Sequence, residues 1–369
     1  MEFFFDFAQT HANSELLKEI DSASKSLFSK LKTTHLDQLD VSGYSKRYLG
    51  NYLEDLTYTL QLYSFILSVA LAYPAMPLNR FALLDYGGGC GMLSLLAREV
   101  GVGTVLYNDL YGPTCRDAEV IGRNLGNLAD AYIQGDIDEI VRHLQSRGLA
   151  CSAVASHDVI EHIYDVQSFI RQLPLLSNGP MSVTMTSGAN IRNFRIRRML
   201  MAKQVDIEYH DKDKRSPTII SDCVKSYLGM RREIIFNHAR SMNREMAETE
   251  IETLAKCTRG LIKADICKAV DVYLEKGVLP QQLHHPTNTC DPDTGNWCEH
   301  LLDHCHLQRL LSDAGFRVKI LSGYYGRGTN PVKRHVKKLL NVGIRALGRQ
   351  GIRLAPFFTL YGERDGEPE

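Results

Sequence analysis

The sequence has no excess of charge of either sign. Its 43 lysines and arginines balance 43 aspartates and glutamates over 369 residues. This balance excludes a general attraction to nucleic acid or to an anionic membrane, so any such attraction must come from one part of the chain. With 44% hydrophobic and 23% charged residues, collagen-like, coiled-coil and disordered chains are also excluded. We therefore expect a folded protein with room for one large domain or two to three smaller ones.

A disulfide framework, a leader peptide and a long apolar run are also missing. The nine cysteines are odd in number and have no repeating spacing, which predicts reduced thiols and a cytoplasmic location. The opening Met-Glu-Phe-Phe-Phe-Asp has no basic stretch followed by an apolar run, so no secretory signal peptide is expected. The uncharged stretch from Leu56 to Tyr73 contains several Ser, Thr and Gln residues. It is predicted to be a buried helix ended by Pro74 rather than a membrane span.

The hydrophobic pattern divides the chain into four parts. Residues 1–75 have apolar side chains at helical spacing, and residues 76–190 alternate short apolar runs with helix-length segments. This alternation predicts βαβ units and a parallel sheet. Residues 191–306 lack such runs and are predicted to be an inserted, mainly helical cap that holds the substrate region. Residues 307–369 would complete the core with two strands and a basic helix. The predicted strands are Phe81–Leu84, Thr104–Tyr107, Ala131–Ile133, Ala153–Ala155, Met181–Thr186, Phe316–Leu321 and Phe357–Tyr361.

A glycine-rich turn follows the first predicted strand. Asp85 ends the strand, and Gly87, Gly89 and Gly91 precede an apolar helical segment. Glycines let the backbone turn tightly and approach a ligand, and the free N–H groups of a helix start attract anionic groups. A dinucleotide-binding G-x-G-x-x-G pattern that begins at Gly87 would need a glycine where the chain has Met92. A nicotinamide-dependent oxidoreductase is therefore the weaker alternative.

Polar residues follow each of the next three predicted strands. Asp109 follows the second, where a carboxylate can accept hydrogen bonds from both hydroxyls of a ribose. Asp136 follows the third and could reach an adenine amino group, and His157 ends the fourth. Because the carboxyl ends of parallel strands meet at one edge of a sheet, we expect these side chains to lie beside the glycine turn.

This series resembles the motifs of class I S-adenosylmethionine-dependent methyltransferases of the small-molecule type. The resemblance implies an α/β fold with a Rossmann-like, seven-stranded, mostly parallel sheet and a reversed C-terminal hairpin. It also implies S-adenosylmethionine as cofactor, with the glycines at its methionine part, Asp109 at the ribose and Asp136 at the adenine. Asp85 and His157 complete the expected cofactor-binding set. The matching segments are Asp85-x-Gly87-x-Gly89-x-Gly91, Asp109, Gly135-Asp136, Val159-Ile160-Glu161-His162 and Ala314-Gly315-Phe316.

Methyl transfer from a sulfonium is an in-line displacement, so the enzyme mainly aligns the acceptor and excludes water. His157 is the candidate catalytic base for an acceptor that must lose a proton, because histidine titrates near neutrality. The alternative is that His157 has no catalytic role and lines the cofactor pocket as a hydrogen-bond donor. A catalytically inactive regulatory protein that binds S-adenosylmethionine is the remaining alternative.

The sequence lacks two motifs, and their absence limits the class of methyl acceptor. The chain has neither an Asn/Asp-Pro-Pro-Tyr/Phe segment after the fourth predicted strand nor a Pro-Cys dipeptide. The resemblance therefore argues against nucleic-acid methylation and favours an oxygen of a small molecule, which could be anionic. Arg192 and Arg195 could clamp an anionic group. Trp297 and His300 are further candidates for the acceptor pocket.

Two segments call for other chemistry. Metal-binding residue types are dense from Cys290 to His306, but their spacing is not that of an ordinary zinc finger, and no metal is predicted. Residues 314–362 contain ten lysines and arginines and no acidic residue. Within them, 331–349 predicts an amphipathic basic helix whose apolar stripe packs on the sheet, with peripheral membrane contact as the alternative. The stripe consists of Val332, Val336, Leu339, Leu340, Ile344 and Leu347.

Overall fold

The computed structural model describes residues 8, 12–35, 38–215, 224–326 and 330–366. The chain forms two compact units. The core unit consists of Met1–Ile160, Gln167–Gly188 and Asp303–Glu369, and the cap unit consists of Glu161–Val166 and Ala189–Leu302. Each unit is described by itself below.

The core unit is built on a seven-stranded sheet with the order β3-β2-β1-β4-β5-β7-β6. β7 runs antiparallel to both β5 and β6, and the other pairs are parallel. This arrangement confirms the fold expected from the resemblance, including the reversed C-terminal hairpin. The strands are β1 (Ala82–Tyr86), β2 (Thr104–Asp109), β3 (Ala131–Gln134), β4 (Ala153–His157), β5 (Met181–Ser187), β6 (Arg317–Ser322) and β7 (Phe358–Arg364).

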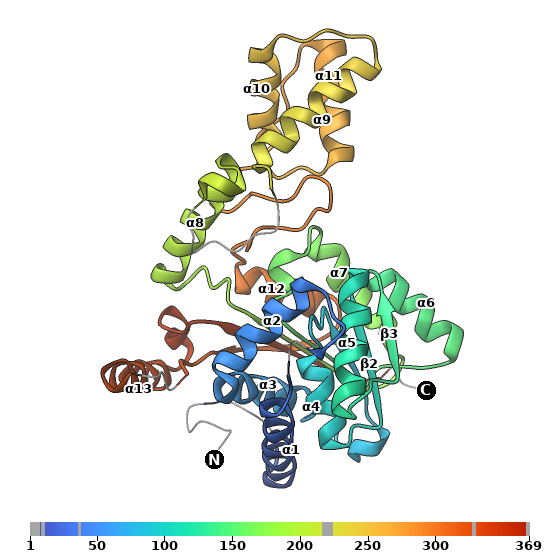
Figure 1. Cartoon of the computed structure of the whole chain (residues 1–369), viewed down its shortest axis with the longest axis vertical. Helices are drawn as coiled ribbons and strands as arrows, with labels where there is room; N and C mark the ends of the chain where they lie inside the picture. The colour runs from blue at the N-terminus through green and yellow to red at the C-terminus, as the bar shows by residue number, and fades with distance from the viewer. Residues whose placement is uncertain (1–7, 9–11, 36–37, 216–223, 327–329, 367–369) are drawn as a thin grey trace. The chain divides into compact units, whose positions relative to one another are not determined.

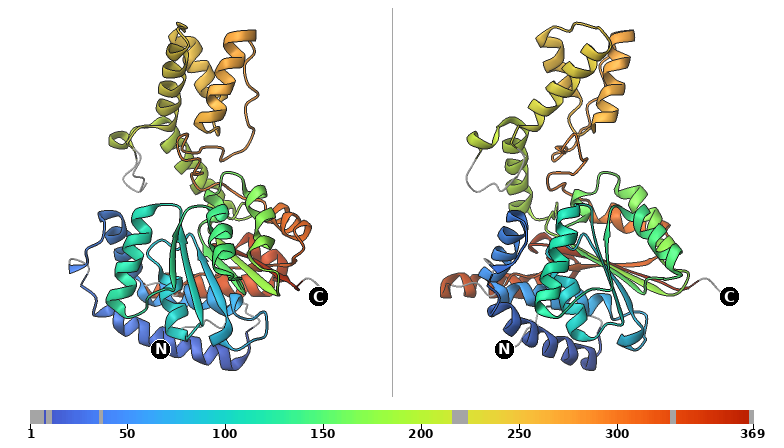
Figure 2. Two further views of the ribbon diagram at one scale, coloured as in Figure 1. Left: turned by 90° about the vertical axis from the view of Figure 1, so that its right-hand side faces the viewer. Right: turned by 45° about the vertical axis from the view of Figure 1, so that its right-hand side comes forward.

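Helices cover both faces of this sheet. Figures 1 and 2 show α3, α4 and α5 on one face and α6, α7 and α12 on the other. The two layers bury the side chains on both faces of the central strands, as a mostly parallel sheet requires. The helices are α1 (Ser14–Lys32), α2 (Gly43–Glu54), α3 (Leu56–Ala70), α4 (Met92–Val100), α5 (Gly112–Leu125), α6 (Ile137–Arg147), α7 (Val166–Gln172), α12 (His304–Asp313) and α13 (Pro331–Ala346).

The uncharged stretch that begins at Leu56 is the buried helix α3. It packs on β4 and β5, and nearly all of its side chains are buried. Its polar residues find partners in this environment, since the hydroxyls of Ser24 and Ser64 lie 2.6 Å apart. No helix among the described residues is long and apolar enough to cross a membrane.

Among the described residues of the cap unit, three helices surround a small apolar cluster, and a fourth packs against one of them. The cluster includes Ile235, Leu254, Ile266 and Val270. Beside it, the buried guanidinium of Arg231 forms an ion pair with the buried carboxylate of Glu208, and its Nε donates to the Ala255 carbonyl at 2.8 Å. The helices are α8 (Phe194–Tyr209), α9 (Tyr227–Ser241), α10 (Glu248–Cys257) and α11 (Lys263–Lys276).

The cap unit differs from the predicted insertion 191–306 in one instructive way. It includes the short piece Glu161–Val166, which lies far from the insertion in the sequence. The backbone explains this, because the N–H of Trp297 donates to the His162 carbonyl and the N–H of His300 donates to the Glu161 carbonyl. At the other boundary, the residues after Leu302 belong to the core unit, because α12 packs on β6 and β7.

The expectation that the apolar stripe of the basic helix packs on the sheet is wrong for most of the stripe. In α13, Val332 is 72% exposed, Val336 51% and Leu339 71%, whereas Ile344 is buried. The helix touches the rest of the core unit mainly near its C-terminal end, through the following turn Gly348–Arg353. The stripe is left uncovered because the described contacts of the helix with the rest of the unit reach only its last turns, where Ile344 is buried.

Candidate functional site

The glycine turn connects β1 to α4 and is held in left-handed conformations. Gly87, Gly89 and Gly91 have φ values of 67°, 52° and 76°, a region that favours glycine. A Cβ at Gly87 would lie 2.6 Å from Cγ2 of Val159, so this position has no room for a side chain. A Cβ at Gly89 would meet nothing within 4 Å. The open side of the turn is therefore at Gly89, where a ligand can approach the backbone.

Asp109 lies at the carboxyl end of β2 and faces this turn. Its Oδ2 accepts a hydrogen bond from the backbone N–H of Gly89 at 3.0 Å, and its Oδ1 accepts one from Tyr111 at 2.9 Å. A carboxylate has about four acceptor positions, so about two remain for a ligand. The half-buried Asp109 thus links the end of β2 to the glycine turn while it keeps acceptor capacity for a pair of hydroxyls.

Asp85 lies near the end of β1, just before the turn, and is 2% exposed. Its Oδ2 accepts hydrogen bonds from the backbone N–H and the hydroxyl of Ser94, at 3.0 and 2.7 Å. Burial raises the pKa of the Asp85 carboxyl to about 7, although the bonds from Ser94 oppose the shift. Asp85 therefore braces the start of α4, and a direct role at the cofactor stays a prediction.

Asp136 is exposed and forms the N-cap of α6. Its Oδ1 accepts hydrogen bonds from the backbone N–H groups of Asp138 and Glu139, at 3.1 and 3.3 Å. The sequence analysis missed this capping role, although an Asp directly before an amphipathic run with acidic residues in its first turn is its usual signal. The second carboxylate oxygen keeps the predicted adenine contact available.

His157 ends β4 at the same edge of the sheet. Its Nε2 lies 3.3 Å from Oδ2 of Asp158, and its ring contacts the ring of Tyr63 edge-on, with centroids 5.6 Å apart. The Nδ1 atom is buried, and no described residue offers it a hydrogen-bond partner. Asp158 itself has a φ of 51° and accepts from the Gly188 N–H at 2.8 Å. His157 therefore lies between Asp158, which is held by the Gly188 N–H, and the ring of Tyr63.

The N-terminal helix α2 adds residues that the sequence analysis did not select. The rings of Tyr44 and Tyr48 lie 4.5 Å apart, and the guanidinium of Arg47 lies over both, at 5.5 and 5.6 Å from their centroids. Tyr44 also meets Tyr111, the residue two positions after Asp109, with ring centroids 6.0 Å apart. Burial raises the pKa of Tyr44, and the nearby Asp109 carboxylate raises it further.

Tyr63 of α3 contacts the ring of His157, and Tyr52 of α2 contacts Tyr63 in turn. The hydroxyl oxygens of Tyr52 and Tyr63 lie 3.4 Å apart, and burial raises the pKa of both groups. Tyr44, Tyr48 and Tyr52 are spaced four residues apart in the sequence. This spacing places them on one helix face, and it is the signal that could have marked α2 as part of the site.

The four residues predicted to bind the acceptor all lie in the cap unit. Arg192 and Arg195 are exposed near the start of α8. Their backbone N–H groups donate to the side chains of Asn190 and Asn193, at 3.1 and 3.0 Å. These bonds fix the backbone at the two arginines, and their proposed role as a clamp stays a prediction.

Trp297 and His300 belong to a stack of rings within the cap unit. Trp297 stacks on Tyr164 with centroids 5.4 Å apart and contacts His300 at 4.5 Å, and His300 lies 4.1 Å from the ring of His285. Burial, with a smaller contribution from His285, lowers the pKa of His300 to about 4. His300 is therefore neutral at pH 7, and its Nδ1 donates to the Thr287 carbonyl at 2.6 Å.

The dense Cys and His segment contributes one residue, Glu299, to the group of possible metal ligands found among the described residues. Within the described part of the chain, residues 290–306 contribute no group made up of their own side chains in which three ligand atoms converge. One mixed group lies in the cap unit, where ligand atoms of Glu161, His162 and Glu299 are within 4.8 Å of one another. Lys203 already supplies a positive charge there, since its Nζ lies 3.0 Å from Oε1 of Glu299.

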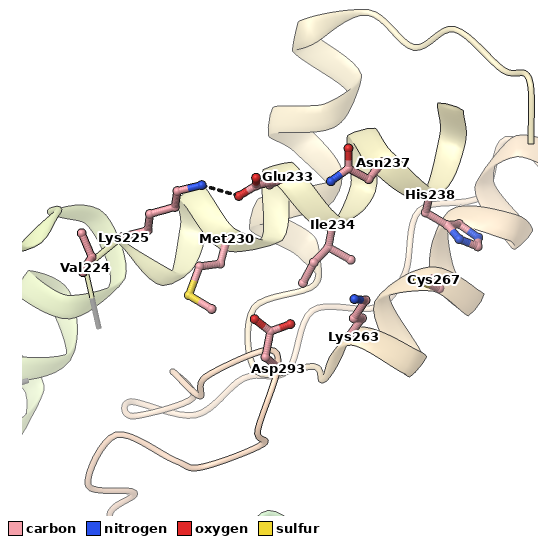
Figure 3. A pocket seen from close by; sticks show the side chains of 10 residues that line it. All are labelled: Val224, Lys225, Met230, Glu233, Ile234, Asn237, His238, Lys263, Cys267 and Asp293. Carbon is pink, nitrogen blue, oxygen red and sulfur yellow. Dashed lines mark hydrogen bonds and ion pairs between the residues drawn. The ribbon is translucent and has the colours of Figure 1, made fainter. Parts of the chain in front are cut away.

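A cleft of about 550 Å³ lies in the cap unit between α9, α11 and the loop at Asp293. Figure 3 shows an apolar floor with Met230 and Ile234 and a polar rim. On this rim Nζ of Lys225 pairs with Glu233 at 2.5 Å. Its described lining residues do not include Arg192, Arg195, Trp297 or His300, so this cleft is separate from the predicted acceptor residues.

No protein-family model and no curated protein matches the chain. Among solved structures, the plantazolicin methyltransferase BamL, in complex with a triazolic desmethylPZN analog and SAH, is 9% identical with a TM-score of 0.38 and covers 96% of this chain and 99% of its own. The CurJ carbon methyltransferase is 10% identical with a TM-score of 0.39, and the match covers 93% of this chain and 67% of CurJ. A SAM-dependent methyltransferase from Archaeoglobus fulgidus is 13% identical with a TM-score of 0.33, and the match covers 78% of this chain and 88% of that protein.

Proposed function

We propose that the chain transfers the methyl group of S-adenosylmethionine to an oxygen atom of a small anionic metabolite. The observation that carries the proposal is the contact between Asp109 and Gly89. It combines a strand-end carboxylate that has acceptor positions left with a glycine turn that is open to a ligand. A ribose with two vicinal hydroxyls, joined to a methionine chain along the turn, fits this combination.

The donors and acceptors of the core unit agree with such a cofactor. Asp109 offers acceptors for the ribose hydroxyls, and the free oxygen of Asp136 offers one for an adenine amino group. The turn at Gly89 leaves room for a ligand beside the backbone. The buried Nδ1 of His157 is a polar atom that a ligand could satisfy, since no described residue does so.

When bound, S-adenosylmethionine would supply an electrophilic methyl group on a positively charged sulfur. The protein then needs to orient the acceptor oxygen in line with that methyl group and to keep water away. Tyrosine side chains of α2 and α3 supply an apolar wall beside His157 for the second task.

His157 would handle the proton of a hydroxyl acceptor. If Nε2–H donates to Oδ2 of Asp158, the neutral ring carries its lone pair on Nδ1. Nδ1 can then accept the proton that the hydroxyl loses as its oxygen bonds to the methyl carbon, and the proton later passes to water. An acceptor that is already an anion would need only orientation, for which Arg192 and Arg195 are the candidates.

Two alternatives keep the same residues in other roles. A regulatory protein would bind S-adenosylmethionine without turnover, and a nicotinamide-dependent oxidoreductase would bind a dinucleotide at the glycine turn. The position of Met92 at the first turn of α4, where it is fully buried, argues against the second, because the dinucleotide pattern has a glycine there.

The proposal is tested by titrating the protein with S-adenosylhomocysteine in a calorimeter, with NADH as the control ligand. We expect wild type to bind S-adenosylhomocysteine and Asp109→Asn to lose about 1.5–3 kcal/mol, roughly 10- to 150-fold in Kd, as for hydrogen bonds to a charged group. Asp21→Asn is the matched control, because Asp21 is a carboxylate on α1 that pairs with Lys25. Binding of NADH in place of S-adenosylhomocysteine would overturn the cofactor assignment.

Turnover is tested separately, with a methyl-labelled cofactor and a panel of small hydroxylated acids. His157→Gln should lower kcat more than it changes the affinity for S-adenosylhomocysteine if Nδ1 takes a proton. Cofactor binding without label transfer to any acceptor on the panel would favour the regulatory alternative.

A further inference from the structure

The amphipathic helix α13 is attached to the core unit at only one end. The side chain of Asn341 accepts a hydrogen bond from the backbone N–H of Tyr325 at 2.8 Å and donates one to its carbonyl at 2.9 Å. Ile344 is buried one turn later. In contrast, none of the first ten residues, Pro331–Leu340, is buried, and Figure 1 shows this helix at the periphery of its unit. A helical piece of this length is marginally stable in water without packing.

The exposed part of α13 carries a continuous apolar stripe. Val332, Val336 and Leu339 are 72%, 51% and 71% exposed, and Leu347 beyond the helix end is 51% exposed. These residues follow one another at three, four or eight positions, which places them on one face. Large aliphatic side chains gain free energy when they leave water, so this face favours an apolar environment.

The same helix presents a concentrated positive charge. Lys333, Arg334, Lys337 and Lys338 flank the stripe, and all but Lys337 are largely exposed. Among the described residues, none of these four forms an ion pair with an acidic side chain, and residues 314–362 contain no Asp or Glu. Because the whole chain is neutral, this charge is a local feature rather than part of a general excess.

We propose that α13 docks on an anionic lipid surface, with its apolar stripe inserted at the level of the headgroups and its basic side chains at the lipid phosphates. A basic amphipathic helix of this kind lies in the plane of the interface, where acyl chains receive the aliphatic residues and anionic headgroups attract the cations. A second copy of the chain fits less well, because pairing two such stripes would bring two rows of lysines together. The proposal does not depend on the proposed function.

The test is cosedimentation of the full chain with vesicles. The probe is phosphatidylcholine with about 30 mol% phosphatidylglycerol, near the anionic content that gives physiological surface potentials, at about 0.1 M NaCl. We expect binding to these vesicles, little binding to pure phosphatidylcholine, and a strong decrease at high salt. Lys333→Gln with Lys337→Gln should lower the partition coefficient about 30-fold, from about 1 kcal/mol for each charge. Val336→Asn with Leu339→Asn should lower it roughly a hundredfold or more.

Matched controls come from exposed residues of the same unit away from α13. Leu175, which is 59% exposed, controls for loss of an aliphatic side chain as Leu175→Asn. Lys18→Gln with Arg142→Gln controls for the loss of two positive charges. Both controls should bind vesicles like wild type, and all variants should keep the wild-type Tm because none of the substituted side chains is buried.

Three results would overturn the proposal. The first is equal binding of wild type and the asparagine variant to anionic vesicles. The second is a concentration-dependent dimer without lipid, measured by light scattering, that the same variant abolishes, since the stripe would then be a contact between copies. The third is equal binding of wild type and the glutamine variant to anionic vesicles at about 0.1 M NaCl, because the basic side chains would then not contact the lipid phosphates.

Discussion

The buried Asp85 predicts a pH dependence of stability that a single substitution should remove. Burial raises the pKa of its carboxyl from 3.8 to about 7 in the folded chain. Between pH 3.8 and about pH 7, the folded state therefore keeps a proton on Asp85 that the unfolded state has already lost. The free energy of unfolding consequently falls as the pH rises through this range. The full penalty is about 4 kcal/mol at pH above 7, from roughly three pKa units at 1.36 kcal/mol each.

Asp85→Asn cannot ionise, yet its amide oxygen can still accept from Ser94, which now holds Oδ2 of the aspartate. The free energy of unfolding of the variant minus that of wild type should therefore become more positive by about 2.5 kcal/mol between about pH 5 and pH 8. Urea denaturation at several pH values, followed by circular dichroism, measures this difference. Other titrating groups cancel because they are common to both proteins.

Asp21→Asn on α1 is the control, and its curve should run parallel to that of wild type. A constant difference between Asp85→Asn and wild type across this pH range would refute the reasoning, because it would mean that the folded chain does not hold a proton at Asp85. If S-adenosylmethionine binds at the turn, the positive charge that it carries would lower the pKa of the Asp85 carboxyl again. Binding of S-adenosylhomocysteine near pH 7 should then release a fraction of a proton, which calorimetry in buffers of different ionisation enthalpy detects.

Two other substitutions test the cap unit and the N-cap of α6. Glu208→Gln leaves the fully buried guanidinium of Arg231 without its anion, so the cap unit should lose about 3–5 kcal/mol. The fluorescence of Trp297, the only tryptophan, reports this loss, and adding Arg231→Met should recover part of it. Asp136→Ala should lower the free energy of unfolding by about 1 kcal/mol, whereas Asp136→Asn keeps the cap; urea denaturation separates them. A loss of affinity for S-adenosylhomocysteine in both variants would support the adenine contact, and wild-type affinity in Asp136→Asn would contradict a role for the charge.

The sheet could be predicted from the sequence because its strands are short buried runs separated by helix-length segments. Each predicted strand overlaps an observed one, and the strand-end positions of Asp109, Asp136 and His157 follow from that pattern alone. Direction and order of the last strands came from the resemblance, since periodicity does not say that Phe358–Arg364 inserts between β5 and β6.

Other features depend on contacts that no local pattern encodes. Tyr63 of α3 reaches His157 only because α3 packs on β4, which is a tertiary contact. The stripe of α13 was predicted correctly as a helical face, but its exposure was not, because tertiary contacts decide which side chains of a helix meet the rest of the unit. Asp136 was predicted only as a contact for an adenine amino group, because its capping bonds become evident only when the start of α6 is known.

The pairing of β5 with β7 has a consequence for how the chain is made. Thr186 on β5 shares a hydrogen bond with Thr359 on β7, 173 positions later, and all seven residues of β5 are buried. During synthesis, one edge of β5 therefore has no native neighbour until almost the whole chain has left the ribosome, while the cap residues are still being added. An unpaired apolar strand edge is an aggregation hazard. A chain that stops before Phe358 should consequently be recovered as aggregate, even though every residue of the glycine turn and of the cap is present.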